Sequence, residues 1–271
     1  MELSAEGRPS SADTMCLIVF AFHCHPSCPL ILAANRDEFY ARPSDRARFW
    51  TGHPDLLAGR DLKYGGTWMG MTRSGRFAAV TNYRDKKEVK EHPLSRGLMV
   101  RAYLTGEDEP GQFLDTVISR QQEYNGFNLL LGDISTLVYY SNRNGKIIRL
   151  EPGVYGLSNH LLDTPWPKTV RTKFKLEHLL MKPGVPDTAD LFRILADRDQ
   201  AADAELPDTG FGIEWERVLS SPFIVSPTYG TRASTVLIAD KQGSVKFEER
   251  AFTGPDDPGF ESLFEFSLTG I

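Results

Sequence analysis

The 271-residue chain has only three cysteines, no long apolar run and no excess of basic residues. Disulfide scaffolds are short, secreted and rich in paired cysteines, so the sequence excludes one and indicates a reducing, intracellular setting. Its longest apolar run, residues 16–22, is far shorter than the roughly 20 residues of a membrane-spanning helix, so we expect no membrane span. Lys and Arg number 31 against 36 Asp and Glu, a net charge of −5 that argues against a nucleic-acid partner.

The order of apolar and polar segments predicts an α+β layered fold. We expect residues 1–14 to be a disordered tail and residues 15–271 to form one domain, beginning with an antiparallel hairpin of residues 16–22 and 30–34. Further strands are expected at 67–71, 77–81, 127–131, 136–141, 154–158, 234–239, 245–249 and 263–268. Helices are expected at 93–105, at 110–123, after Thr164 as N-cap, and from 187 or 188 to 198. The third helix would bury the face carrying Trp166, Val170, Phe174 and Leu180.

Cys16 stands at the head of the first predicted strand, directly after Met15. If translation starts at Met15, or if residues up to Met15 are removed, Cys16 gains a free α-amine beside its own thiol. An α-amine has a pKa near ~7.7–8.0, so it can act as the base for that thiol at neutral pH. The alternative is that Cys16 is a small buried hydrophobe, as free cysteines usually are.

Several polar residues follow apolar strand runs, where they can converge on Cys16. The hairpin returns Asn35-Arg36-Asp37-Glu38 to the start of the first strand, and Arg36 and Asp37 can hold a thiolate, a carboxylate or an α-ammonium group. Side-chain amides of Asn82 and Asn159 can donate to an oxyanion, and Arg232 can bind an acid group. Each of these residues has a simpler interpretation as a turn residue or a charged strand end. Gly65-Gly66 is likewise interpreted first as a turn, and only second as a site where the backbone approaches a ligand closely.

One short segment contains potential metal ligands: His23, Cys24, His25 and Cys28. No second Cys or His pair occurs at a zinc-site spacing, so we predict a hairpin loop and no metal site. The six histidines leave haem open as a ligand on composition alone.

Linked motifs in the chain resemble the NRDE family, also called the Transport and Golgi organisation protein 2 family. They are Met15-Cys16-Leu17-Ile18-Val19-Phe20, Asn35-Arg36-Asp37-Glu38-Phe39-Tyr40, Gly65-Gly66-Thr67-Trp68-Met69-Gly70, Thr81-Asn82-Tyr83, Tyr124-Asn125-Gly126-Phe127-Asn128, Tyr155-Gly156-Leu157-Ser158-Asn159 with Thr164-Pro165-Trp166, and Tyr229-Gly230-Thr231-Arg232. The resemblance departs from the family at residues 1–14, which leave Cys16 with an amide nitrogen, and at the His23-Cys24-His25 cluster.

That family is in turn similar to N-terminal-nucleophile hydrolases, which implies a four-layer αββα sandwich of two antiparallel sheets flanked by helices. The resemblance implies Cys16 as nucleophile, Arg36 and Asp37 as its supporting charges, Asn82 and Asn159 as oxyanion donors, and Arg232 as a site arginine. The matching motifs also suggest six ligand-binding residues: Asn35, Glu38, Gly66, Thr67, Trp68 and Tyr83.

Two functions remain open at this point. One is hydrolysis of an amide or thioester through an acyl-cysteine. The other is binding and trafficking of haem or acyl-coenzyme A, linked to secretory-pathway organisation, with no bond broken. We expect no required cofactor, with haem only as cargo, and a cytoplasmic location with mitochondrial or Golgi association as alternatives.

Overall fold

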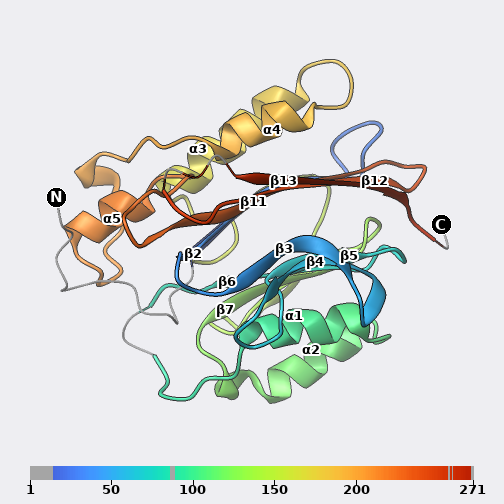
Figure 1. Cartoon of the computed structure of the whole chain (residues 1–271), viewed down its shortest axis with the longest axis horizontal. Helices are drawn as coiled ribbons and strands as arrows, with labels where there is room; N and C mark the ends of the chain where they lie inside the picture. Colours follow the sequence, from blue (N-terminus) through green and yellow to red (C-terminus); the bar gives the residue numbers. More distant parts are fainter. Residues whose placement is uncertain (1–14, 86–88, 256, 258, 270–271) are drawn as a thin grey trace.

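The computed structural model describes residues 15–85, 89–255, 257 and 259–269, so the expected tail at 1–14 lies outside the described residues. Two antiparallel sheets lie face to face between two layers of helices (Figure 1). This confirms the predicted α+β, four-layer αββα arrangement. Among the described residues, no helix has the length and apolar character that crossing a membrane requires.

The first sheet has six strands in the order β10-β1-β2-β11-β12-β13. They are β1 (Met15–Phe22), β2 (Leu30–Phe39), β10 (Gly153–Leu157), β11 (Tyr229–Ala239), β12 (Ser244–Ala251) and β13 (Phe260–Ser267). The predicted hairpin is present, with Cys16 opposite Arg36 and Met15 opposite Asp37. The motif Asn35–Glu38 lies inside β2 and does not close it as expected, because β2 continues along β11 to the pair Phe39 and Tyr229.

The second sheet has seven strands in sequence order, each paired with the next. They are β3 (Ser44–Trp50), β4 (His53–Asp61), β5 (Met69–Thr72), β6 (Phe77–Asn82), β7 (Phe127–Gly132), β8 (Leu137–Ser141) and β9 (Ile147–Arg149). Alternate side chains of facing strands fill the space between the sheets, including Ile18 and Phe20 of β1 and Phe77 of β6. This central core joins the two halves of the molecule.

Helices cover both outer faces (Figure 1). The second sheet is covered by α1 (Arg96–Thr105) and α2 (Pro110–Ser119), and the first by α3 (Pro167–Leu180), α4 (Thr188–Leu195) and α5 (Ile213–Leu219). In the described part of the chain the other helical turns are 3-10: Gln121–Glu123 and Asp203–Glu205.

The predicted buried face of α3 is wrong. Val170 and Phe174 are 51% and 57% exposed, whereas the helix buries Lys168, Thr169, Thr172, Leu176 and Leu179. Leu176 packs with Val19 and Ala21 of β1, which fixes the rotation of the helix. The helix also starts later than predicted, with Trp166 as N-cap and Pro167 in the first turn.

Candidate functional site

A cavity of about 780 Å³ opens between the two sheets at the head of β1. Six of the predicted site residues line it: Cys16, Arg36, Thr67, Trp68, Asn82 and Arg232. They come from β1, β2, the β4–β5 loop, β6 and β11, so the fold brings together residues separated by more than two hundred positions. A cavity of this size accommodates a small organic molecule.

Cys16 reaches this cavity because of the alternation of side chains along β1. Ile18 and Phe20, which lie on the same face of the strand as Cys16, point toward the second sheet, whereas Val19 and Ala21 point toward the helices. The Cys16 residue is 2% exposed. Burial first, and then the Asp37 charge, raise the pKa of its thiol to about 12. The thiol is therefore protonated at neutral pH while residue 15 precedes it.

Two asparagines are joined to the backbone of Cys16. The Cys16 N–H donates to Asn159 Oδ1 at 3.3 Å, and Asn159 Nδ2 donates to the Asn82 carbonyl at 3.1 Å. The Ser158 hydroxyl donates to the Cys16 carbonyl at 2.8 Å. Asn82 lines the cavity, and Asn159 is fully buried behind Cys16. Asn159 therefore holds the backbone nitrogen of Cys16 and links it to Asn82, while the roles predicted for these residues stay predictions.

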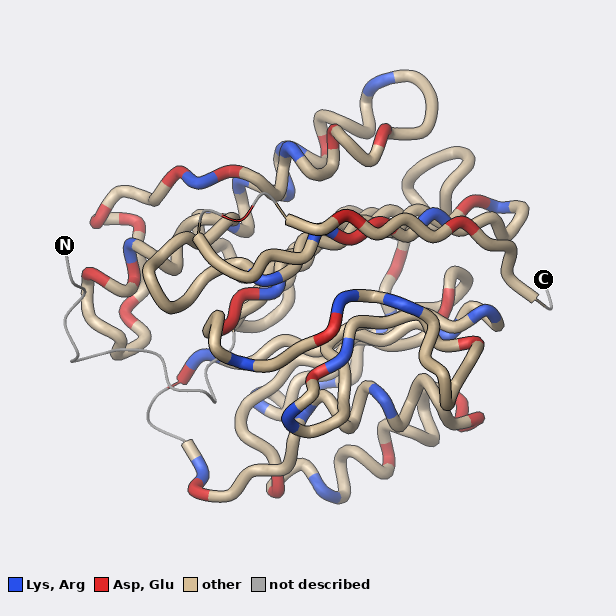
Figure 2. Tube along the Cα trace, in the orientation of Figure 1, with Lys and Arg blue, Asp and Glu red and all other residues tan. Residues whose placement is uncertain are grey.

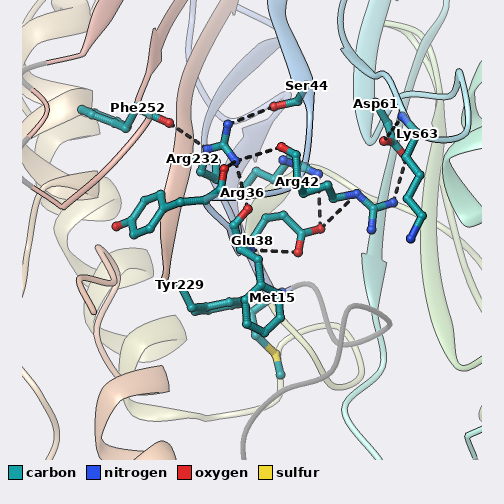
Figure 3. A network of polar contacts seen from close by, with 12 residues as sticks. Met15, Arg36, Glu38, Arg42, Ser44, Asp61, Lys63, Tyr229, Arg232 and Phe252 are labelled. Atoms are coloured by element: carbon teal, nitrogen blue, oxygen red, sulfur yellow. Dashed lines mark hydrogen bonds and ion pairs between the residues drawn. The ribbon is translucent and has the colours of Figure 1, made fainter. Parts of the chain in front are cut away.

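Arginines and one glutamate form a polar network in the wall of the cavity (Figure 3). Glu38 lies 3.5 Å from Arg36 and 3.4 Å from Arg42, which also pairs with Asp61 at 2.8 Å. Arg232 donates to the carbonyls of Phe39, Tyr40, Arg42 and Phe252 at 2.8–3.1 Å. Arg232 therefore fixes the chain that follows β2, in addition to lining the cavity.

Asp37 lies on the opposite, helix-covered face of the sheet, beside Met15. Its Oδ1 accepts the Thr231 hydroxyl at 2.7 Å, and its Oδ2 has no hydrogen-bond partner among the described residues. Burial raises the pKa of Asp37 to about 6, while Lys168, Thr231 and Arg36 lower it. The two predicted supporting charges, Arg36 and Asp37, thus flank the strand head from opposite faces.

Lys168, the second residue of α3, belongs to the same region and was missed from the sequence. It is 2% exposed, and burial lowers the pKa of its ammonium group to about 8 despite the attraction of Asp37. The apolar periodicity assigned the wrong face of α3 to the interior, and Lys168 lies outside the face that it marked as buried. One sequence feature could have identified Lys168: it directly follows Trp166-Pro167 at the start of a helix, where the helix dipole disfavours a cation.

The other predicted ligand-binding residues are not among the cavity-lining residues. Asn35 is buried under the helices, where its Nδ2 donates to the carbonyls of Leu195 and Pro222. The Tyr83 hydroxyl lies 2.6 Å from His160 Nε2. Glu38 pairs with Arg36 and Arg42 in the network described above. Gly66 packs against the backbone of Gly97. Their role toward a ligand stays a prediction.

Gly66 makes a close backbone approach to the start of α1. A Cβ at this position would lie 2.4 Å from the Gly97 carbonyl carbon, and Thr67 N–H donates to Gly97 O at 3.1 Å. We expect Gly66→Ala to lower the free energy of unfolding by about 1–3 kcal/mol, because the added methyl overpacks rigid backbone. Gly111→Ala in α2 is the control, since nothing lies within 4 Å of its added Cβ. Equal urea midpoints for the two variants would contradict the prediction.

The His23–Cys28 loop does not bring its ligand types together. Among the described residues there is no group of three or more His, Cys, Asp or Glu side chains with metal-binding geometry. His25 Nδ1 instead accepts the backbone N–H groups of Ser27 and Cys28, both at 3.2 Å, which organises the turn. Cys24 is exposed and Cys28 is buried.

Comparison with known proteins identifies the family. The family model described as Transport and Golgi organisation 2 matches residues 15–254. The human Transport and Golgi organization protein 2 homolog is 38% identical over 94% of this chain and 99% of its own length. The Drosophila melanogaster Transport and Golgi organization protein 2 is 27% identical over 90% and 95%.

Similar solved structures are more distant. A Caenorhabditis elegans N-acylethanolamine-hydrolyzing acid amidase ortholog has a TM-score of 0.48 at 11% identity, covering 82% of this chain and 92% of its own. A conjugated bile acid hydrolase mutant from Clostridium perfringens has a TM-score of 0.40 at 8% identity, covering 97% and 86%. The extent of the family match and the identity to the human homolog together show that this chain belongs to the Transport and Golgi organisation 2 family.

Proposed function

We propose that the protein is a cysteine amidohydrolase or thioesterase whose nucleophile is Cys16, active once Cys16 is the first residue. The observation that carries the proposal is the grouping of Cys16, Arg36, Asn82 and Arg232 in the wall of one cavity. In acyl transfer a thiol can serve as nucleophile, an amide can donate to the oxyanion, and guanidinium groups can bind an acidic substrate group. The intact chain holds the same site in a masked state, because the Cys16 nitrogen is then an amide bonded to Met15 and cannot act as a base.

The proposed reaction proceeds through an acyl-cysteine. The Cys16 α-amine takes the thiol proton, and the sulfur attacks the carbonyl carbon of the substrate. The oxyanion that forms is held by the side-chain amide of Asn82 in the cavity wall, and Asn159 positions that residue through the 3.1 Å bond from its Nδ2 to the Asn82 carbonyl. The C–N or C–S bond then breaks, the leaving group takes the proton from the α-ammonium, and water hydrolyses the acyl-sulfur bond. The Arg36 and Arg232 guanidinium groups face an acidic substrate group in this scheme.

Comparison of the full chain with a chain that begins at Cys16 tests this function. Both are incubated with acyl p-nitroanilides and acyl thioesters, and intact mass follows the acyl adduct. We expect turnover and a covalent adduct only in the chain beginning at Cys16, and neither after Cys16→Ser. A folded chain beginning at Cys16 that forms no adduct and hydrolyses no faster than Cys16→Ser would overturn the proposal.

A second function, binding of an anionic acyl-coenzyme A or haem without bond cleavage, is favoured by the charge of the cavity. Its lining carries seven Lys and Arg residues against four Asp and Glu, although the whole chain is acidic. Figure 2 shows basic and acidic positions interleaved on β3 and β4, which form one side of this wall. Trp68, Tyr64, Phe252 and Phe260 add apolar surface. This function predicts saturable binding of acyl-coenzyme A, or a haem Soret shift, that survives Cys16→Ser.

The proposed setting is inside the cell. All three cysteines are free thiols, which is usual in compartments that keep thiols reduced. We propose a cytoplasmic location, with association to the Golgi or mitochondria as the alternatives.

A further inference from the structure

Lys168 is a buried cation in a position that is unfavourable for three reasons. The residue is 2% exposed, and its Nζ has no hydrogen-bond partner among the described residues. It also lies in the first turn of α3, where the positive end of the helix dipole repels a cation. A buried, unpaired ammonium group is costly, so such residues are retained where they serve a site.

The surroundings of Lys168 connect it to Cys16. α3 packs on β1 and β10 from the helix-covered face of the first sheet. The charged or titratable groups that act on Lys168 are Asp37 of β2, Cys16 of β1, Arg84 after β6 and Glu216 of α5. Of these, Arg84 and Glu216 are paired with each other at 3.2 Å. Asp37 retains one unpartnered oxygen, so it is the anion left to balance Lys168.

We propose that Lys168 is a positioning residue of the Cys16 site: a buried cation that keeps Asp37 ionised and controls how readily the thiol on the other face of the sheet loses its proton. This inference deepens the proposed function and rests on Cys16 being its nucleophile. It adds a residue that supports the site from the helical layer, without touching the substrate.

The signs of the electrostatic effects are defined. The Asp37 carboxylate raises the pKa of the Cys16 thiol, because it repels the thiolate, and the Lys168 ammonium lowers it. Without Lys168, Asp37 loses the largest of the interactions that lower its own pKa. At a pH where Asp37 stays ionised, removing the ammonium therefore disfavours the thiolate, and removing the carboxylate favours it.

The test measures Cys16 alkylation by iodoacetamide in the full chain, in a Cys24→Ser background, from about pH 7 to about pH 10. The thiolate attacks the iodoacetamide methylene carbon, iodide leaves, and the thiol proton passes to the buffer. We expect Lys168→Met to slow this reaction about fivefold or more between about pH 7 and the Lys168 pKa of about 8, and the two rate profiles to converge toward about pH 10, where Lys168 of the parent chain is itself neutral. Asp37→Asn should accelerate it. Lys173→Met, which removes an exposed partner of Asp163 on the same helix, is the matched control and should leave the rates unchanged.

Superimposable rate profiles for Lys168→Met and the parent chain, both folded by circular dichroism, would overturn the inference. A purely structural lysine would change the unfolding midpoint and leave that profile in place. Should Lys168→Met fail to fold, Asp37→Asn decides, because an unchanged or slower rate contradicts the inference. Alkylation requires no hydrolysis. A chain beginning at Cys16 that cleaves no substrate, together with a shifted Lys168→Met profile, would therefore refute the proposed function and leave the control of the thiol by Lys168 standing.

Discussion

Iodoacetamide at neutral pH is expected to label Cys24 of the full chain and to leave Cys16 unmodified. Burial and the Asp37 charge raise the pKa of Cys16 from 9.0 to about 12, which lowers its thiolate fraction about a thousandfold. Cys24 is exposed, and burial of part of its surface raises its thiol pKa, so the difference between the two sites should be at least about a hundredfold. Peptide mass spectrometry over a time course measures both rates in one sample.

The same chain supplies the control for accessibility. Cys28 is buried like Cys16 but lies outside the cavity lining, and its thiol pKa is raised mainly by burial. As the pH is raised, Cys16 should begin to react with iodoacetamide while the protein is still folded, because the cavity gives the reagent access to its thiol. Rapid labelling of Cys16 at neutral pH in the full chain would show that the thiol is activated without a free α-amine, contrary to its masking by residue 15.

The sequence was most informative where local pattern and strand pairing agree. The two apolar runs separated by a Pro-containing loop predicted the first hairpin, and its register puts Arg36 opposite Cys16. Eight further strand predictions overlap observed strands, although β3, β4 and β9 were missed. Charged residues interrupt β3 and β4, and all three residues of β9 are exposed, so none of them shows a buried apolar run.

The site was harder to predict, because its geometry depends on which face each residue occupies. Asp37 and Arg36 are adjacent in sequence and therefore point to opposite faces of β2, one toward Met15 and the helices, the other into the cavity. Lys168 escaped notice because α3 buries threonines and a lysine at its start while leaving Phe174 exposed. Such burial of polar residues depends on contacts from distant elements, which apolar periodicity does not encode.

Arg84→Met and Glu216→Gln are each expected to lower the free energy of unfolding by about 3–5 kcal/mol at neutral pH. The two side chains are 3.2 Å apart and almost completely buried, so removing one charge leaves the other without compensation. Arg84 also lies over the Trp166 ring at 4.3 Å, and Glu216 Oε1 accepts two hydrogen bonds from Thr209. Urea unfolding of the variants and the parent chain measures the loss.

The double variant separates the ion pair from simple packing. Arg84→Met with Glu216→Gln leaves no unpaired charge and retains an acceptor for Thr209, so it should lose less stability than the two single losses added together. Arg217→Met on the same helix is the control, because its pair with Asp203 is exposed and should hardly move the midpoint. Additive losses would mean that the pair is not coupled. Because the Arg84 N–H donates to the Asn159 carbonyl at 2.7 Å, a coupled pair also anchors the residue that holds the Cys16 backbone, and its loss should loosen the site.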